Sequence, residues 1–396
     1  MANKPKIRFK GFDDAWEQRK LGEYVSIISG EAPSKFEEGT ELYVKVDDLN
    51  YNDKYVVDTQ NKVAEHSTVK RVTKGSVVFP KRGAAIMTNK VRIIGIDSYM
   101  DTNMMALTSE KLDSEFLYNI ISKEGLYKIA DTSTIPQINN KHVEPYEVTI
   151  PSLDEQRRIG AYFKQLDHLI TLHQRKCDQM KELKKYMLTK MFPQNGSKVP
   201  EIRFYGFTDD WEQRKLGEIA TETYGGGTPK TSNEEFWKGD IPWIQSSDLI
   251  DECLFDVRPR KCISQEAVSK SATKLVPQNS IAIVTRVGVG KLAFMPFSYA
   301  TSQDFLSLSG LKIDPEFTVY ALFKMMQSVS NEVQGTSIKG VTKDELLAKK
   351  IIFPSCNEQK KIGAYLHNLD HLITLHQSKC ENLKNLKKYM LRNMFV

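Results

Sequence analysis

The sequence lacks the features of a membrane-spanning, exported or disulfide-stapled protein. No apolar run in the 396 residues approaches the roughly 18 to 20 residues needed to cross a bilayer, and the opening MANKPKIRFKGF lacks the apolar core of a secretion signal. The five cysteines form no CxxC pair, so reduced thiols and no bound metal are expected. We therefore expect a cytoplasmic protein with no membrane partner.

Signatures of catalysis are also missing. Gly290 and Lys291 resemble the end of a phosphate loop, but Leu292 stands where a Walker A motif requires Ser or Thr. His367 and His371 have the spacing of a helical zinc pair without a third ligand close by, so a solvated helix face is favoured. No G-x-S-x-G elbow and no Asn/Asp-Pro-Pro-aromatic tetrapeptide occurs. We expect a chain that is not itself an enzyme and has no catalytic residue.

The chain does contain a long internal duplication. The segment PKIRFKGFDDAWEQRKLGE (residues 5–23) returns as PEIRFYGFTDDWEQRKLGE (residues 200–218), identical at 15 of 19 positions. Residues 151–192 return as residues 354–395, identical at 28 of 42 positions, and both copies contain LDHLITLHQ. Two nearly constant blocks therefore frame, in each half, a segment that is free to differ.

The longer repeated block is predicted to be a helix. Ser152 with Glu155, and Ser355 with Glu358, have the S-x-x-E spacing of a capping box, in which each side chain satisfies the other residue's backbone N–H. Apolar positions then recur every 3.5 residues, which predicts a left-handed coiled coil between the two copies. Roughly 40 residues at about 1.5 Å each make a rod of ~60 Å, which suits a spacer.

The predicted coiled-coil seam contains the same residues in both copies. Polar seam residues, here His173 and Lys184 with their equivalents, can fix the register, while Leu169, Leu172 and Leu183 with theirs widen the stripe toward another subunit. The seam comprises Leu166, Ile170, His173, Cys177, Met180 and Met187, and in the second copy Leu369, Ile373, His376, Cys380, Leu383 and Met390.

The two variable segments, residues 24–150 and 219–353, are predicted to be mixed α/β (α+β). Short β-branched runs bounded by Gly, Pro or Asn indicate strands, and helical apolar spacing indicates helices. Strands are expected at residues 75–80, 91–96, 279–285 and 346–354, and helices at residues 114–130 and 316–329. The whole arrangement is two similar modules separated by two long helices, related by a pseudo-twofold internal repeat.

These features resemble the specificity (S) subunits of type I restriction-modification enzymes over essentially the whole chain. The resemblance rests on W-x-x-R-K-L-G-E at residues 16–23 and 211–218, on P-S-x-x-E-Q-[RK]-[RK]-I at residues 151–159 and 354–362, and on the long helices that follow. The second variable segment adds G-x-T-P (Gly226 to Pro229), FWKGDIPWIQSSDL (Phe236 to Leu249) and GTSIKGVTKDEL (Gly335 to Leu346). The first departs from these letters, which implies a different half-site.

The resemblance implies two target-recognition domains and an antiparallel pair of conserved helices. The expected segments are residues 1–150 (first target-recognition domain with its N-terminal conserved segment), 151–198 (central conserved helix), 199–353 (second target-recognition domain) and 354–396 (C-terminal conserved helix). Each domain would read one half of a bipartite, asymmetric site in double-stranded DNA, and the helices would set the unread spacer. The implied cell is bacterial or archaeal.

The resemblance also implies partners and their cofactors. Two methyltransferase (M) subunits would carry S-adenosylmethionine and methylate adenine at N6. Restriction (R) subunits, using ATP and Mg, would complete an ATP-dependent site-specific deoxyribonuclease. This chain would hold none of these cofactors.

DNA-contacting residues are expected among the polar side chains of the variable segments, because Lys and Arg bind phosphates while Arg, Lys, Asn and Gln reach base edges. Arg82 and Arg286 are the favoured individual residues, since each follows an apolar strand and precedes a Gly-containing loop. Trp243, Met104 and Met105 are assigned to the core. The expected contacts are Lys45, Lys81, Arg82, Lys90, Arg92, Asn103, Gln137, Asn139, Asn140 and Lys141 in the first segment, and Gln245, Ser246, Arg286, Lys291, Gln303, Thr336, Ser337 and Lys339 in the second.

Two other functions fit the same residues. A duplicated DNA-binding regulator would bind its site tightly alone, and a protein-binding scaffold would use the helices and bind no DNA. The net charge of +6 is mild and favours a chain that needs partners, since a lone regulator often has a denser basic patch.

Overall fold

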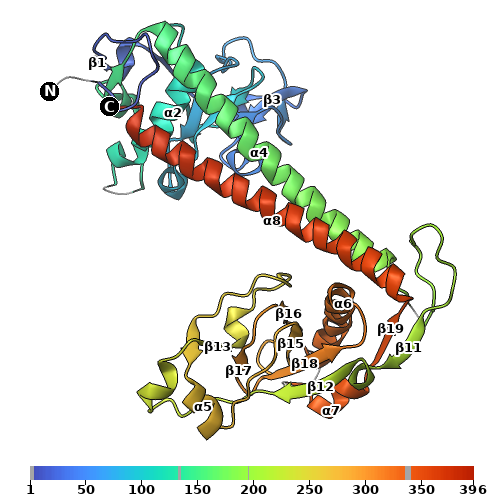
Figure 1. The fold of residues 1–396 in the computed structure, drawn as a ribbon. Coiled ribbons are helices and arrows are strands. Elements are labelled where there is room, and N and C mark those ends of the chain that lie inside the picture. The colour runs from blue at the N-terminus through green and yellow to red at the C-terminus, as the bar shows by residue number, and fades with distance from the viewer. Residues whose placement is uncertain (1–3, 133–134, 195, 335–339) are drawn as a thin grey trace. The chain divides into compact units, whose positions relative to one another are not determined.

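The computed structural model describes residues 4–132, 135–194, 196–334 and 340–396, and the chain forms two compact units (Figure 1). The first unit is Met1–Gln174 with Gln377–Val396, and the second is Arg175–His376. Two long helices, α4 (Leu153–Lys190) and α8 (Cys356–Asn393), are therefore each shared between the units. The predicted domain boundaries at residues 150, 198 and 353 stay predictions. No helix of the described part is long and apolar enough to cross a membrane.

The first unit is built on a five-stranded sheet with an α-helix packed on it. Strands β6 (Val77–Pro80) and β9 (Met104–Thr108) are buried along almost their whole length, as expected for the middle of a covered sheet. The helix α2 (Ser114–Glu124) packs on β6 and on β7 (Arg92–Ile94), while α1 (Asp48–Tyr51) and α3 (Asn140–Val143) are short. The sheet order is β2 (Ser26–Ser29), β9 (Met104–Thr108), β6 (Val77–Pro80), β7 (Arg92–Ile94) and β4 (Tyr55–Val56).

Two smaller sheets complete the first unit. In the three-stranded one, β3 (Glu41–Val44) lies between β5 (Lys62–Val63) and β8 (Tyr99–Met100), parallel to β8 and antiparallel to β5. In the two-stranded one, β1 (Glu17–Lys20) pairs with β10 (Glu147–Ile150), so the repeated EQRK stretch joins the strand that leads into α4.

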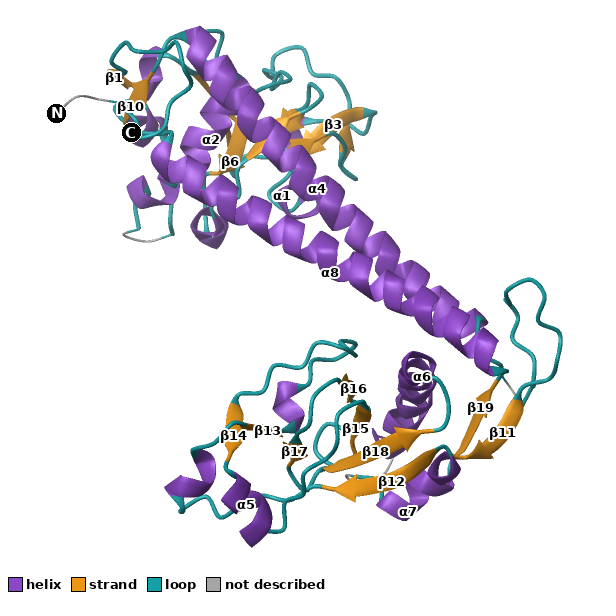
Figure 2. Ribbon diagram, viewed as in Figure 1, coloured by secondary structure: helices purple, strands orange, loops and turns teal. Residues whose placement is uncertain are grey.

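The second unit has a related architecture (Figure 2), with four strands in its main sheet where the first unit has five. The order of its four-stranded sheet is β12 (Ala220–Gly225), β18 (Phe305–Leu311), β15 (Ser280–Val284) and β16 (Leu292–Met295). In the three-stranded sheet β13 (Ile241–Ile244) lies between β14 (Lys261–Ile263) and β17 (Ala300–Thr301). In the two-stranded sheet β11 (Glu212–Lys215) pairs with β19 (Lys350–Phe353). Its helices are α5 (Gln265–Lys270), α6 (Pro315–Gln334) and α7 (Lys343–Ala348). The β13–β17 pair is parallel like β3–β8, so both variable segments fold alike.

Most predicted elements are confirmed, and two are wrong in part. The helix predicted for residues 114–130 ends at Glu124, because Gly125 adopts the left-handed conformation (φ 70°). The Gly125 N–H donates to the Ile121 carbonyl and so caps the end of the helix. The strand predicted for residues 346–354 begins only at Lys350, because Thr342 and Glu345 form a capping box that starts α7.

Both long helices start one residue after a serine, as the S-x-x-E spacing predicts. The Ser152 hydroxyl accepts a hydrogen bond from the Glu155 N–H at 3.4 Å. At the second helix the Glu358 N–H donates to the Ser355 carbonyl at 3.0 Å rather than to its hydroxyl, so the side-chain cap predicted for Ser355 is wrong. The reciprocal half of the predicted capping box, from the glutamate carboxylate back to the serine N–H, is wrong at both helices. Instead, the buried Glu155 carboxylate accepts two hydrogen bonds from Arg8, each 2.7 Å long, and Glu358 accepts two from Arg203 at 2.7 and 2.8 Å. A guanidinium fork matches a carboxylate in this way, so each I-R-F segment is tied to the start of a long helix.

In each unit the long helices lie side by side and antiparallel, as Figure 1 shows in green and red. In the first unit Lys387 Nζ lies 2.5 Å from Asp167 Oδ1, and in the second Lys184 Nζ lies 2.6 Å from Asp370 Oδ1. All predicted seam residues are at least partly buried: Leu166, Cys177, Leu369, Ile373 and Cys380 are buried, while Ile170, His173, Met180, Met187, His376, Leu383 and Met390 are half-buried.

An aromatic cluster closes the core where each long helix ends. In the first unit the Phe395 ring lies 5.4 Å from that of Phe116 and 6.2 Å from that of Trp16. In the second, Phe192 lies 5.5 Å from Phe317 and 5.9 Å from Trp211. A helix that begins in one unit therefore supplies a core residue to the other.

Candidate nucleic-acid interface

In the first unit, three distant segments meet where β6 ends. The Lys81 N–H donates to the Asn103 carbonyl at 2.8 Å, and the Lys81 carbonyl accepts from the Ile138 N–H at 2.8 Å. Arg82 forms an antiparallel bridge with Gln137. The fold thus brings together Lys81, Arg82, Asn103 and Gln137, four of the residues chosen for DNA contact.

The side chains of this cluster are held in different ways. Arg82 is exposed, whereas burial lowers the pKa of Lys81 against the opposing effect of Glu31 and Asp101. The Asn103 amide donates to Asp101 Oδ1 at 2.7 Å. Exposed Arg82 is therefore the side chain of the four with the most freedom to reach a base or a phosphate.

The remaining predicted residues of the first unit have varied roles. Lys45 is half-buried with its Nζ 5.9 Å from the Tyr43 ring, and Lys90 is bonded to Asn50 Oδ1. The Arg92 guanidinium donates to the Asn52 and Val91 carbonyls, which makes it a structural link between β7 and the chain after α1. Asn139, which accepts from the Gln137 amide at 3.0 Å, precedes the exposed Asn140 and Lys141 of α3.

The second unit presents different side chains at the equivalent strand end. Where Lys81 follows β6, buried Thr285 follows β15; its N–H donates to the Asp304 carbonyl and its carbonyl accepts from Val341. Arg286 is exposed, like Arg82. The Gln303 amide oxygen accepts from the Thr228 hydroxyl at 2.6 Å.

The other predicted residues of this unit lie on two linked loops. Gln245 and Ser246 lie at the end of β13, where the Gln245 N–H donates to Asp248 Oδ2 at 2.9 Å. Lys291 Nζ donates to the Leu249 carbonyl at 3.1 Å, so it ties the loop after β15 to the loop after β13. Thr336, Ser337 and Lys339 lie outside the described residues.

Sequence reasoning missed two aspartates that position these loops. The buried Asp48 accepts from the Lys45 N–H at 2.7 Å and from the Thr59 hydroxyl at 2.9 Å, and Asp248 holds Gln245 in the same way. Each directly precedes a buried leucine shortly after the strand end, and this K/Q-x-x-D-L spacing was the available signal.

The three residues assigned to the core are buried. Trp243 is 3% exposed with its indole N–H donating to the Gly227 carbonyl, while Met104 and Met105 lie inside β9. His367 packs edge-on against Phe255, with ring centroids 4.5 Å apart. Within the described ranges, no group of three or more His, Cys, Asp or Glu side chains is placed to hold a metal.

The fold defines a duplicated protein in which one scaffold carries two different polar surfaces. The family described as type I restriction modification DNA specificity domain matches residues 13–182 and 208–385. The chain belongs to this family.

Several specificity subunits are similar to the chain. The MjaIX specificity subunit of Methanocaldococcus jannaschii is 30% identical over 194 residues, which is 47% of this chain and 44% of that protein. The EcoR124I/EcoR124II subunit of Escherichia coli is 34% identical over 172 residues, 41% of each chain. The matched segments thus span less than half of these two relatives. The M. jannaschii MjaVIII subunit is 23% identical over 95% of this chain and 91% of its own.

Solved structures agree in fold. The type I restriction-modification S subunit from M. genitalium has a TM-score of 0.66 at 14% identity and covers 99% of both chains. A structure described as the structural basis of complex assembly and conformational transition of the type I system has a TM-score of 0.55 at 19% identity, covering 97% of this chain.

Proposed function

We propose that this chain is the DNA-recognition subunit of a type I restriction-modification complex. The variable domain of each unit reads one half of a bipartite, asymmetric site in double-stranded DNA. Bases are read in the major groove by the exposed polar side chains near the ends of β6 and β15, and phosphates are bound by surrounding lysines. The chain supplies recognition and positioning, and the reactions occur on other subunits.

One observation carries this proposal: the scaffold is repeated while the presented side chains differ. Arg8 with Glu155 and Arg203 with Glu358 repeat the same buried pair. On that common frame, Lys81 with Arg82 is replaced by Thr285 with Arg286. Two similar domains with different surfaces suit a target with two different halves, since a symmetric protein would favour a symmetric site.

The partners follow from the exposed apolar residues of the long helices. Exposed leucines and tyrosines on a helix face mark a surface for another protein. The exposed leucines and tyrosines of the two long helices are Leu172, Leu183 and Tyr186 on α4, and Leu372, Leu375, Leu386 and Tyr389 on α8. We assign this face to two methyltransferase subunits, which bring S-adenosylmethionine and methylate adenine at N6. Restriction subunits, with ATP and Mg, join that core, and the helix pair sets the spacer between half-sites.

Base-modification sequencing tests the proposal. Genomic DNA is compared between cells that carry the methyltransferase partner with this chain and cells that carry the partner without it. The expected result is a bipartite adenine-methylated sequence that appears only with the chain. An unchanged pattern of modified bases rejects the proposal. Tight, site-specific binding by the purified chain alone, with no modification in cells, would favour a stand-alone regulator instead.

A further inference from the structure

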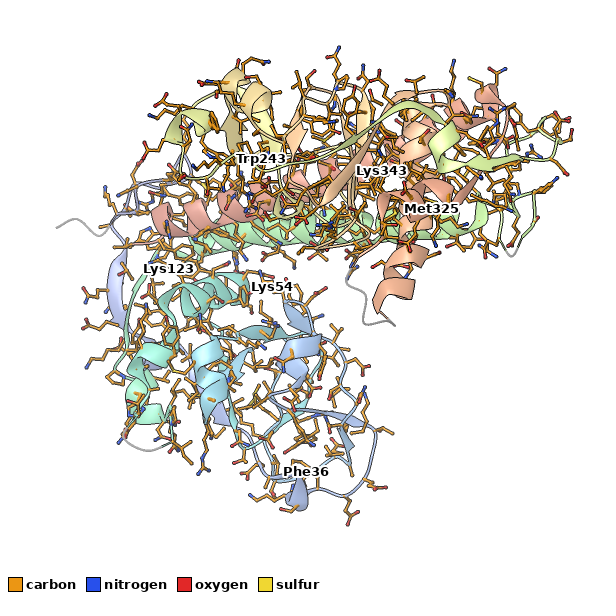
Figure 3. All side chains as sticks on the ribbon, turned by 90° about the horizontal axis from the view of Figure 1, so that it is seen from below. Phe36, Lys54, Lys123, Trp243, Met325 and Lys343 are labelled. Carbon is orange, nitrogen blue, oxygen red and sulfur yellow. The ribbon has the colours of Figure 1, made fainter. Side chains whose placement is uncertain are left out.

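A basic groove of about 500 Å³ lies in the first unit, between α8, α4 and the end of α2. Five cations and one carboxylate line it: Lys123, Lys384, Lys387, Lys388, Arg392 and Asp167. Figure 3 shows Lys123 and Lys54 at the side of the domain that adjoins the long helices. No residue chosen for base reading lies in this groove, so base recognition does not account for its charge.

The carboxylate and two of the cations in the groove are already paired. Asp167 accepts from Lys387 through Oδ1 and from Lys54 through Oδ2, at 2.5 and 2.8 Å. Lys123 Nζ lies 3.0 Å from Glu124 Oε1. Lys384, Lys388 and Arg392 are all exposed, and among the residues that the structure describes no carboxylate pairs with them. Their three charges are therefore available to an external anion.

The three available cations form a line rather than a cup. They follow one another at four-residue spacing on α8, which places successive residues about 6 Å apart along the helix and the outer two about 12 Å apart. A small anion needs donors that converge on one point. One strand of duplex DNA carries a phosphate every ~3.4 Å of axis, and neighbouring phosphates lie further apart than this rise because the strand also winds around the axis. A row of cations at the spacing of the ladder can therefore contact several phosphates of one strand.

We propose that the ladder formed by Lys384, Lys388 and Arg392 binds the phosphate backbone of duplex DNA beside the half-site read by the first unit. The inference rests on the proposed function and assigns a phosphate-contacting role to the repeated helix itself. Contacts to phosphates carry no sequence information. The ladder therefore contributes affinity and its dependence on salt without changing which bases are recognised.

The internal repeat supplies a matched comparison for the ladder. The equivalent residues on α4 are Lys181, Lys185 and Thr189, and the Thr189 hydroxyl donates to the Lys185 carbonyl at 3.0 Å. The equivalent positions on α4 thus hold two of the three cations. Thr is accepted at this helix position, so Arg392→Thr is a substitution that the scaffold itself already carries once.

The test uses the full-length chain assembled with its methyltransferase partner. Dissociation constants for a duplex carrying the bipartite site are measured by fluorescence anisotropy between about 50 and 200 mM salt. Each neutralised phosphate contributes about 0.9 to the slope of log K against log salt. The triple variant Lys384→Gln/Lys388→Gln/Arg392→Gln should lower the magnitude of this slope by about 2.7. Over this range of salt the wild-type complex should therefore lose about 40-fold more affinity than the variant complex loses. Arg392→Thr should lower the slope by about 0.9.

The control removes the same charge elsewhere in the first unit. Lys20→Gln/Lys74→Gln/Lys111→Gln neutralises three exposed lysines that do not line the groove, and its slope should match wild type. A ladder variant with the wild-type slope overturns the inference. So does a ladder variant that no longer assembles with its partner by mass photometry, because the groove would then be a protein-docking surface.

A duplex without the site separates this inference from the proposed function. Release of counterions needs no base recognition, so the ladder variant should lower the slope on that duplex as well. If wild type prefers no bipartite sequence, the proposed function fails while the ladder result stands. If wild type prefers its site but the slope does not change in the ladder variant, only the ladder fails.

Discussion

Asp167 pairs with Lys387 across the helix pair at 2.5 Å, and its other oxygen accepts from Lys54 of the first variable domain at 2.8 Å. In the second unit the equivalent Asp370 pairs through Oδ1 with Lys184 Nζ at 2.6 Å, and its Oδ2 accepts a hydrogen bond from the Tyr320 hydroxyl at 2.6 Å. The aspartate and its helix partner are thus repeated, whereas the variable domain supplies a different residue in each unit. One constant position on the scaffold thus contacts two domains that are alike in fold but differ in sequence.

Removing Lys184 should destabilise the second unit. In Lys184→Ala the largely buried Asp370 carboxylate keeps only the hydrogen bond from the Tyr320 hydroxyl. Removing one partner of such an ion pair lowers the free energy of unfolding by about 3 kcal/mol. Urea unfolding followed by circular dichroism measures the loss. Lys184→Met with Asp370→Leu should recover most of it, because no buried charge remains. If the double variant is no more stable than Lys184→Ala, the pair is not the cause.

Cutting back the terminal aromatic residues should weaken one unit at a time. Phe395→Ala opens a cavity beside Trp16, and Phe192→Ala opens one beside Trp211, at about 3 to 5 kcal/mol each. Hydrogen exchange followed by mass spectrometry should show faster exchange around Trp16 in the first variant and around Trp211 in the second. Equal acceleration around both tryptophans in either variant would contradict this assignment.

Alkaline pH should destabilise the second unit through Tyr299. Burial raises the pKa of Tyr299 from 10.0 to about 12. The folded state therefore favours the neutral phenol, so this contribution is complete below the unfolded-state pKa and is lost as the pH rises through the folded-state pKa. A difference of one between the folded and unfolded pKa corresponds to about 1.4 kcal/mol of unfolding free energy.

Tyr299→Phe separates this effect from other alkaline titrations. The variant should be less stable than wild type at about pH 9, because the hydroxyl bonds to Ser280 and Ser307 are lost. The difference should shrink by about 1 kcal/mol between roughly pH 9 and pH 11, as measured by urea unfolding midpoints. A difference that stays constant with pH would contradict the raised pKa.

Replacing one exposed arginine should relax recognition of one half-site only. Arg82→Gln and Arg286→Gln each remove a guanidinium, at a cost of about 1 to 3 kcal/mol in discrimination if that group contacts a base pair. Competition binding with substituted duplexes measures the discrimination at each position. A uniform loss of affinity for every duplex would instead identify the arginine as a phosphate contact.

Features encoded locally could be predicted from the sequence. The seam residues follow a 3.5-residue period, and Ser152 stands next to the first residue of α4, so neighbouring letters carry the information. The Arg8 partner of Glu155 is 147 residues away, and no local pattern indicates it. The same limit explains why the reciprocal capping contact was predicted instead.

The candidate interface was only partly accessible for the same reason. Lys81, Asn103 and Gln137 become neighbours only after β6, β9 and a later loop have packed, and the order of strands in a sheet is not encoded in any one strand. The charge of Arg92 predicts a DNA contact, yet its guanidinium donates hydrogen bonds to two backbone carbonyls. Polarity in a variable segment identifies candidates, and hydrogen bonding then decides which remain available.

The most direct test of the account exchanges residues 24–150 for the corresponding segment of another specificity subunit and sequences the methylated bases in cells. The repeated scaffold and the second variable segment are left unchanged. The account predicts a new bipartite sequence in which one half has changed while the other half and the spacer length are retained. Replacement of both halves, or methylation of the original sequence, would contradict the assignment of one half-site to each domain.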